Sequence, residues 1–558
     1  MKSHWFKALC LAVTMLIFTS SLLIGCTGVA PSATATIAPT ADTTAIAATT
    51  AEQTTEPAKG PEWLLDVTPI TLSVFIDSPS GEVVWGDDPV TKEITRRTGI
   101  TCDIRVATTA DSQQLNTMMA SGELTDFIVL PGNTPARTSL IKQQYVQPLN
   151  KLIDQYCPAM WQILPKGQAE IFAEADGNLY NIGSWYCDVE RLANLKGANI
   201  TDGMFSLNRP MYEAAGSPAL KTLDDYTALL KQIKEKNPDL PFLAYDGNIA
   251  SVQNNMVQLI NRIYGGTDSK AIAADGSVHL NFQDESYLKA IKYVNLLYRE
   301  GLFNAENFTV KGEQFNELGK NQKIFSYWGL CFSIFQFDMS KEGPYDPTEP
   351  PQEPGTKLGL KNVSASIGSG GGVMISTSCK TPDRAIRYME FMNSDEGQVL
   401  MGYGLEGKDY TIEEGALKYS EADMALLNSD WAKYVKETGA YNFGVAWIIS
   451  RYTDCMAYYW LNKSNTKYNL VNQIYNKFAV NERLNEVIQL DNDSKEKVIE
   501  AKIFDLWQQS MPKMILAETE DACIQAHANF VDEAKKQGLE ELQAAYTTIC
   551  KSWQVKLK

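Results

Sequence analysis

Histidine and cysteine are the residue types whose spacing could support metal binding or nucleophilic catalysis in this chain. The sequence of 558 residues holds 3 histidines, of which His4 lies in the apolar N-terminal segment. His279 and His527 lie far apart and have no ligand-type neighbours at metal-binding spacing. This pattern argues against a zinc site and against a histidine-based catalytic triad.

The 10 cysteines form no metal or redox motif, because none belongs to a C-x-x-C pair. Apart from Cys10 and Cys26, they are single and widely spaced: Cys102, Cys157, Cys187, Cys331, Cys379, Cys455, Cys523 and Cys550. An exported chain permits disulfides. Scattered cysteines in a large domain are more often small buried hydrophobes, so no pairing is assigned.

The first residues have the pattern of an export signal, with Lys2 and Lys7 before a mostly apolar run over 8–24. The end of the run, Leu23-Ile24-Gly25-Cys26, resembles the lipobox of bacterial lipoproteins, in which a peptidase cuts before the cysteine and the cysteine carries lipid. The alternative is one transmembrane helix, but the run is short for a span of ~20 residues. We therefore predict a signal peptide over 1–25 and a lipidated Cys26.

Composition predicts a tether after the signal and a large folded part beyond it. Residues 27–60 are rich in Ala and Thr and have no apolar period, so they should be disordered. The rest of the chain is long enough for at least two domains. The net charge of −17 argues against nucleic acid as a partner, since that ligand requires clustered Lys and Arg.

The first ordered region has a β-α-β-α-β pattern. Strands are predicted over 70–76, 102–106 and 126–130, and helices from Pro89 to Gly99 and over 112–121. This order predicts an open parallel sheet, in which ligands meet the loops beyond the carboxyl ends of the strands. The loops over 77–87 and 131–137 are therefore candidate ligand loops.

Later segments add a helix that starts with a capping box at 222–225 and a last third, 421–553, dominated by helical patterns. The glycine-rich run over 366–373 matches neither phosphate-binding glycine motif. We interpret it as a close backbone crossing between lobes.

Several stretches together resemble the extracellular solute-binding lipoproteins of carbohydrate ABC importers in Gram-positive bacteria, in the large oligosaccharide-binding branch. They are DDPVTKEITRRTG at 87–99, LNTMMASGELTD at 115–126, DGNLY at 176–180, YREGL at 298–302, YGLEGKDYT at 403–411 and the run over 530–546. The resemblance implies a periplasmic-binding-protein-like α/β fold, in which each lobe is an open, mostly parallel sheet flanked by helices and a hinge joins the lobes. We expect an N-terminal lobe over 61–180 and about 365–405, and a C-terminal lobe over 181–364 and about 406–558.

The resemblance also implies a function. The chain would capture an oligosaccharide between its lobes and deliver it to ABC permease subunits. It would act as a monomer on the extracellular face of the cell membrane, anchored by diacylglyceryl and palmitate-type lipid at Cys26, without catalysis or cofactor. Relatives often carry a calcium loop after the helix that here ends at Lys236. This chain reads Asn237-Pro238-Asp239-Leu240-Pro241-Phe242 there and lacks the ~6–8 oxygen ligands that calcium needs.

Sugar binding would call for flat aromatic rings over C–H faces and fixed polar groups for hydroxyls. The candidates that lie in loops or near strand ends are Trp85, Asn133, Trp185, Tyr186, Tyr245, Asp246, Tyr327, Trp328 and Trp447. For each aromatic residue, packing in the core is the alternative.

Two other functions stay open. A secreted carbohydrate-active enzyme needs two carboxylates ~5–9.5 Å apart, which could occur among the 67 acids. Nothing in the chain resembles the eight repeated β/α units of a barrel enzyme. A peptide or polyol could also occupy the same kind of cleft.

Overall fold

The computed structural model describes residues 61–79, 84–109, 111–164, 168–183, 186, 203–244, 256–329, 343–362, 371–413, 416–440 and 466–556. They form two compact units. The N-terminal unit takes the described residues of 28–185 and 368–462, and the C-terminal unit takes those of 186–367 and 463–558. The expected division into two α/β parts is thus present.

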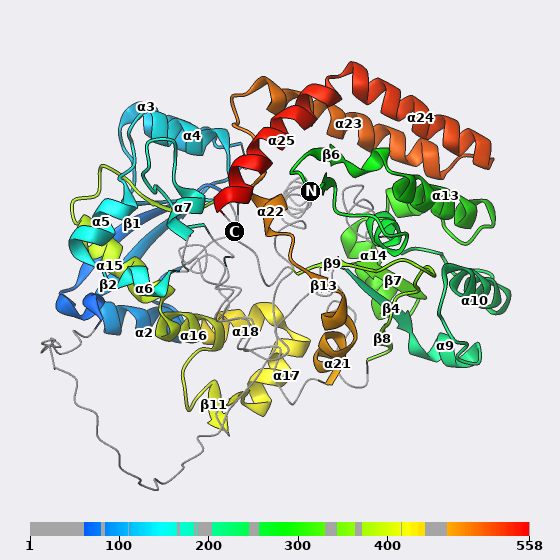
Figure 1. The fold of residues 1–558 in the computed structure, drawn as a ribbon. Coiled ribbons are helices and arrows are strands. Elements are labelled where there is room, and N and C mark those ends of the chain that lie inside the picture. The colour runs from blue at the N-terminus through cyan, green and yellow to red at the C-terminus, as the bar shows by residue number, and fades with distance from the viewer. Residues whose placement is uncertain are drawn as a thin grey trace, which may run out of the picture. The chain divides into compact units, whose positions relative to one another are not determined.

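A four-stranded sheet in the order β10-β3-β1-β2 forms the centre of the N-terminal unit (Figure 1). Its strands are β1 (Ile70–Ile76), β2 (Ile100–Val106), β3 (Phe127–Leu130) and β10 (Gly372–Ile375). β1 runs parallel to both β2 and β3, whereas β10 runs antiparallel to β3. The predicted mostly parallel sheet is confirmed here, and the loops after β1, β2 and β3 leave from the same edge.

Local sequence signals explain the first helices. α2 (Pro89–Thr98) begins where the Asp88 carboxylate accepts a hydrogen bond from the Thr91 backbone N–H at 2.8 Å. α3 (Gln113–Ser121) ends at Gly122, whose left-handed backbone (φ 73°) closes its last turn. Both helices fall where the sequence predicts them.

The same unit holds further helices. They are η1 (Glu62–Leu65), α4 (Pro135–Lys142), α5 (Leu149–Tyr156), α6 (Met160–Ile163), α7 (Gln168–Phe172), α15 (Pro382–Asn393), α16 (Asp395–Tyr403), α17 (Glu421–Ser429) and α18 (Trp431–Thr438). A small hairpin joins β11 (Tyr410–Glu413) to β12 (Ala416–Tyr419). α15 packs against η1, α5, α6 and β10, so it ties the first described element to the sheet.

One expected boundary is wrong. The sequence-based expectation puts residues from about 406 onward in the C-terminal lobe, yet the described residues up to 440 belong to the N-terminal unit. α18 packs on α2, and Gly439 at its end lies so close to Asp88 that a Cβ there would be 1.9 Å from Asp88 Oδ1. A helical pattern predicts a buried face but not the unit against which that face packs.

The C-terminal unit holds a three-stranded sheet in the order β7-β4-β8. Its strands are β4 (Met204–Asn208), β7 (Ser326–Gly329) and β8 (Tyr345–Thr348). The expectation of a mostly parallel sheet is wrong for these strands, because β7 and β8 both pair antiparallel with β4. β4 lies between β7 and β8 and runs opposite to both, so both described ladders of this sheet are antiparallel.

Helices and short strands surround that sheet. They are α9 (Arg209–Ala214), α10 (Leu223–Lys236), α12 (Gln258–Ile263), β5 (Lys270–Ile272), β6 (Val278–Leu280), η3 (Asn281–Gln283), α13 (Glu285–Arg299), η4 (Ala305–Phe308), α14 (Gly312–Lys320), β9 (Leu360–Lys361), α21 (Thr466–Tyr475), η7 (Asn476–Phe478), β13 (Ala479–Val480), α22 (Arg483–Val487), α23 (Lys495–Ile515), α24 (Glu520–Lys536) and α25 (Leu539–Lys556). α10 starts with the predicted capping box of Thr222 and Asp225. α23, α24 and α25 pack together (orange to red in Figure 1), as the helical pattern of the last third predicts.

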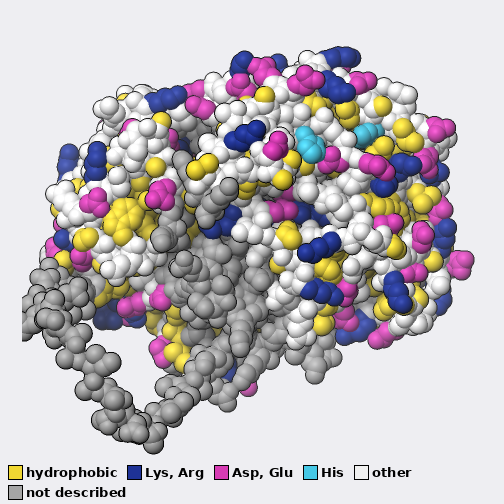
Figure 2. All heavy atoms as spheres, viewed as in Figure 1, with side chains coloured by type: hydrophobic (Ala, Val, Ile, Leu, Met, Phe, Trp, Pro, Cys, Tyr) yellow, Lys and Arg dark blue, Asp and Glu magenta, His cyan; other side chains and the backbone are white. Residues whose placement is uncertain are grey.

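The surface and the thiols agree with the composition. Acidic and basic side chains are interspersed on the face drawn in Figure 2, with no gathered basic patch there. Within the described residues, Cys102, Cys157, Cys379, Cys523 and Cys550 are all buried and free of disulfides. No helix of the described ranges is long and apolar enough to cross a membrane.

Candidate functional site

The carboxyl edge of the N-terminal sheet gathers polar residues from several loops. Asp77 directly follows β1, and Ser112 precedes α3 in the loop after β2. The Asp77 backbone N–H donates to the Val129 carbonyl at 2.9 Å, which continues the pairing of β1 with β3 beyond Ile76. Because β1 lies between β2 and β3, Asp77 stands at the middle of this edge.

The Asp77 carboxylate is buried, with 2% of the residue exposed. Its Oδ2 accepts a hydrogen bond from the Ser112 hydroxyl at 2.5 Å, whereas its Oδ1 has no hydrogen-bond partner among the described residues. Burial raises the pKa of Asp77, the bond from Ser112 opposes that shift, and the charge of Asp111 adds to it. A buried acceptor without a donor costs free energy, so this atom is suited to accept a bond from a ligand.

Ser112 holds a left-handed backbone conformation (φ 56°), which is uncommon outside glycine. Such a conformation costs about 1–3 kcal/mol and persists only where the surroundings impose it. Here the conformation lies at the start of α3 and presents the hydroxyl to Asp77. The pair is thus held in place by local backbone geometry.

A second polar group lies beside the loop after β3. Arg137, near the start of α4, is 8% exposed and pairs with Glu174 at 2.6 Å. Its guanidinium donates to Asn181 Oδ1 from Nε (3.0 Å) and Nη2 (2.8 Å). Asn181 in turn donates to the Gly371 carbonyl at 3.0 Å. This network links the loop after β3 to the chain that enters β10.

Two glycines permit a close backbone crossing at that point. A Cβ on Gly371 would lie 2.4 Å from the Gly132 nitrogen, and one on Gly372 would lie 2.0 Å from the Ile182 carbonyl oxygen. Any larger residue would push these backbones apart. The glycine-rich run therefore does form a close backbone crossing at its described end, but these contacts lie within the N-terminal unit rather than between lobes.

Two sequence-predicted ligand residues lie in this unit. Trp85 is half-buried, and its indole N–H donates to Thr95 Oγ1 of α2 at 2.9 Å. The indole nitrogen is therefore committed to α2. Asn133 lies in the loop after β3 and is exposed. Both stay proposals for ligand contact.

The aromatic pair of β7 lies in the core, which corrects our expectation for Trp328 and Tyr327. Trp328 is 0% exposed, its indole N–H donates to the Tyr226 hydroxyl at 3.0 Å, and its ring lies 4.5 Å from that of Phe205. Tyr327 is also buried and packs against Phe315 of α14. The two rings point to opposite faces of β7, and both faces are covered by helices.

Tyr186 is buried as well, so its own ring is not exposed to a ligand. The other expected ligand residues lie outside the described residues, as does Cys26; they are Trp185, Tyr245, Asp246 and Trp447. The candidate loops 77–87 and 131–137 contain Asp77 and Arg137, but sequence reasoning named neither as a site residue, and it missed Ser112 and Asn181 altogether. The signal for Asp77, a charged residue directly after an apolar strand, is not specific to a site.

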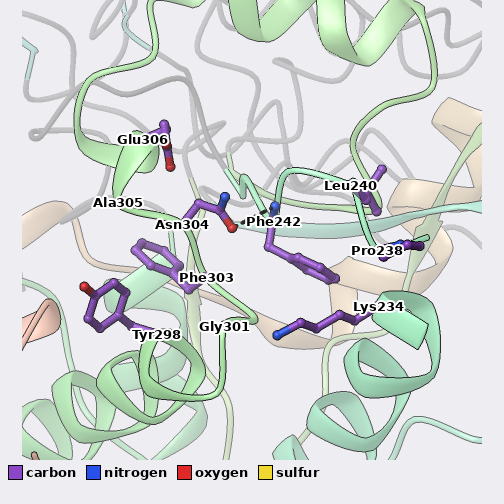
Figure 3. A pocket seen from close by; sticks show the side chains of 10 residues that line it. All are labelled: Lys234, Pro238, Leu240, Phe242, Tyr298, Gly301, Phe303, Asn304, Ala305 and Glu306. Carbon is purple, nitrogen blue, oxygen red and sulfur yellow. Dashed lines mark hydrogen bonds between the residues drawn. The ribbon is translucent and has the colours of Figure 1, made fainter. Parts of the chain in front are cut away.

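A cavity of about 350 Å³ lies in the C-terminal unit where α10 and α13 end (Figure 3). The Lys234 ammonium extends across it and donates to the Glu300 carbonyl at 2.9 Å. Asn304 Oδ1 accepts from the Phe242 backbone N–H at 3.2 Å, and Glu306 supplies the one carboxylate of the lining. Calcium requires ~6–8 oxygens, so a cavity with a fixed ammonium and one carboxylate does not fit that ion.

Residues 85–399 match the family of bacterial extracellular solute-binding proteins, and the chain belongs to that family. Two α/β units, with polar groups at the carboxyl edge of a parallel sheet, agree with that class of protein.

Known relatives are distant. The chain is 23% identical over 254 residues to the fructooligosaccharide ABC transporter substrate-binding protein FusA of Streptococcus pneumoniae, which covers 43% of this chain and 46% of FusA. It thus matches about half the length of that relative. It is 22% identical over 379 residues to the lipoprotein LipO of Bacillus subtilis, 64% of this chain and 71% of LipO. The structure of FusA in complex with kestose superposes with a TM-score of 0.67 at 18% identity, covering 87% of this chain and 100% of that one, which confirms the fold.

Proposed function

We propose that this protein is an extracellular receptor that captures an oligosaccharide and hands it to an ABC permease. The family membership supports a solute-binding role. The relative FusA, named for fructooligosaccharide transport, supports a sugar as the solute. No catalytic step is assigned to the chain.

The observation that carries the proposal is the buried Asp77 carboxylate at the carboxyl edge of the N-terminal sheet. Its Oδ1, which has no partner among the described residues, offers an acceptor, and a sugar hydroxyl is a suitable donor. A hydrogen bond from a ligand would remove the cost of that unsatisfied atom. A neutral polyhydroxyl ligand suits this arrangement better than an anion, because an anion would add a further negative charge beside Asp77 and Asp111.

A binding screen with a turnover control tests this function. The purified chain is heated with a panel of oligosaccharides, kestose included, and a bound sugar should raise the melting temperature. The same mixtures are then analysed by chromatography. A melting shift with unchanged sugar supports the receptor, whereas release of shorter sugars would identify a carbohydrate-active enzyme instead. A shift with peptides alone would reject the sugar.

Lipid anchoring at Cys26 completes the proposed role, and the lipoprotein LipO supports it. A diacylglyceryl group has two acyl chains, which is what stable attachment requires. The Cys26→Ala variant should appear in the medium or soluble fraction, with Cys10→Ala as the control that stays with the membrane. If Cys26→Ala stays membrane-bound after high salt, the anchor is a retained helix.

A further inference from the structure

A second cluster of reactive side chains lies in the N-terminal unit, away from the carboxyl edge. Glu62 in η1, Cys157 after α5 and Glu390 in α15 offer ligand atoms that all lie within 4.8 Å of one another. Cys157 and Glu390 are buried, and Glu62 is half-buried. The three residues are far apart in the sequence, so only the packing of η1 and α5 on α15 brings them together.

Backbone groups orient both carboxylates by one oxygen each. Glu390 Oε1 accepts from the Glu62 backbone N–H at 3.3 Å, and Glu62 Oε2 accepts from the Ala159 backbone N–H at 3.2 Å. Glu390 Oε2 has no hydrogen-bond partner among the described residues, although Glu390 is 1% exposed. Hydrogen bonds to one carboxylate oxygen that leave the other available are the usual support for a metal ligand.

No cation pairs directly with the two carboxylates among the described residues, although the charge of Arg387 acts on both Glu390 and Cys157 from a distance. Arg387 of α15 instead donates to the Tyr156 carbonyl at 3.3 Å and pairs with Asp383 at 3.4 Å. Two neighbouring carboxylates, one of them fully buried, are costly without a positive partner. A divalent cation would supply that partner.

We propose that Glu62, Cys157 and Glu390 bind a zinc ion, with a water as the fourth ligand on the half-buried side of Glu62. Zinc takes thiolate sulfur and carboxylate oxygen in a tetrahedral arrangement, whereas calcium and magnesium prefer oxygen alone. Burial raises the pKa of the Cys157 thiol, so the metal-free sulfur carries a proton that binding must release to the solvent. This proposal departs from the expectation of no metal, which rested on the scarcity of histidine.

The ion would connect three elements of one unit. η1 is the first described element. It meets α15 through the Trp63–Phe391 ring contact, with centroids 5.5 Å apart, and Glu62 adds hydrogen bonds to Glu390 and to the Ala159 backbone. Zinc bound to the folded state alone raises stability by mass action. The role would therefore be to fix the N-terminal end of the folded part to the unit.

Zinc titration of the chelator-treated full chain tests the site. We expect one zinc per chain by elemental analysis, a higher melting temperature with zinc, and a thiolate-to-metal absorption band when cobalt replaces zinc. Cys157→Ser should abolish that band, and Glu390→Gln should weaken zinc binding about tenfold or more. The control Cys379→Ser, a buried cysteine outside the cluster, should bind zinc unchanged.

Two results would overturn the proposal. One is no retained zinc at micromolar concentration in the wild-type chain. The other is an unchanged cobalt band in Cys157→Ser, which would place the metal on another thiol. If Cys157→Ser does not fold, zinc affinity is measured in Glu62→Gln, which changes the half-buried residue of the cluster. Unchanged zinc affinity in that variant also rejects the site.

Discussion

The Asp77 carboxylate accepts a hydrogen bond from the Ser112 hydroxyl at 2.5 Å across the loops after β1 and β2. One oxygen is thereby satisfied, and the other, Oδ1, is buried without a partner among the described residues. The pair combines a fixed orientation with one unused acceptor. The unsatisfied oxygen lowers the stability of the free protein. A ligand that donates a hydrogen bond to it removes that penalty.

The first prediction is that Asp77→Asn stabilises the free protein and weakens ligand binding. The folded-state pKa of Asp77 is raised by burial, so the folded state binds more protons than the unfolded state above the unfolded pKa. Stability from this group therefore falls as pH rises from the unfolded pKa through the folded pKa, and the penalty is complete above the folded pKa. Asparagine removes that penalty, and loss of the charged hydrogen bond should cost about 1.5–3 kcal/mol of binding energy.

Melting temperature and calorimetric affinity, measured with the same sugar, check both parts. The control is Asp103→Asn, an exposed acid on the neighbouring strand β2, which should change neither quantity appreciably. A destabilised Asp77→Asn with wild-type affinity would make Asp77 a structural residue and remove it from the site.

The second prediction is that Trp328→Ala lowers the free energy of unfolding by about 3–5 kcal/mol, the usual cost of truncating a buried tryptophan. The variant leaves a cavity beside Phe205 and takes the donor away from the Tyr226 hydroxyl. Denaturant unfolding measures the loss. Trp85→Ala, at a half-buried ring, is the matched control and should cost less. If Trp328→Ala instead keeps the wild-type stability and loses sugar binding, Trp328 is a ligand-binding residue.

Local sequence signals account for much of the N-terminal sheet and its helices. β-branched runs, the Asp88 cap and the glycine after α3 act within a few residues, so their consequences are readable without the fold. The strand direction in the C-terminal unit is not predictable in this way, because it depends on which strands pair with β4. The packing partner of α18 is not predictable either, because its sequence pattern indicates a buried face but does not identify α2 as the helix that covers it.

The candidate site shows the same limit more sharply. An acid after a strand has the same sequence signature whether it caps a helix, faces solvent or is buried unpaired, so sequence reasoning does not single out Asp77. Trp328 is a candidate by its type and position, but the facing Tyr226 of α10, which decides its role, lies 102 positions away in sequence. Whether a polar atom is buried without a hydrogen-bond partner is decided by tertiary packing.

The third prediction concerns the cavity in Figure 3. Lys234→Met should lower the free energy of unfolding by about 1–3 kcal/mol, because it leaves the Glu300 carbonyl without its charged donor. Lys231→Met is the control: Lys231 lies on the same helix but pairs with the Glu300 carboxylate at the surface, 2.7 Å away, and such pairs contribute about 0–1 kcal/mol. Calcium and a calcium chelator should leave the wild-type melting temperature unchanged. A chelator-dependent drop would show that calcium binds despite the lysine.

The fourth prediction is a pH dependence that comes from His527. This side chain of α24 is buried, and its Nε2 lies 2.8 Å from the Phe282 carbonyl oxygen. Burial lowers the pKa of His527, so the unfolded state binds more protons between the folded pKa and the ordinary value of 6.5. The stability contribution is thus complete above pH 6.5 and is lost as pH falls below it.

Between pH 7 and 5.5 the melting temperature of the wild-type chain should fall, and the melting temperature of His527→Gln should fall less. Equal slopes in the wild-type chain and in His527→Gln would exclude His527 as the cause.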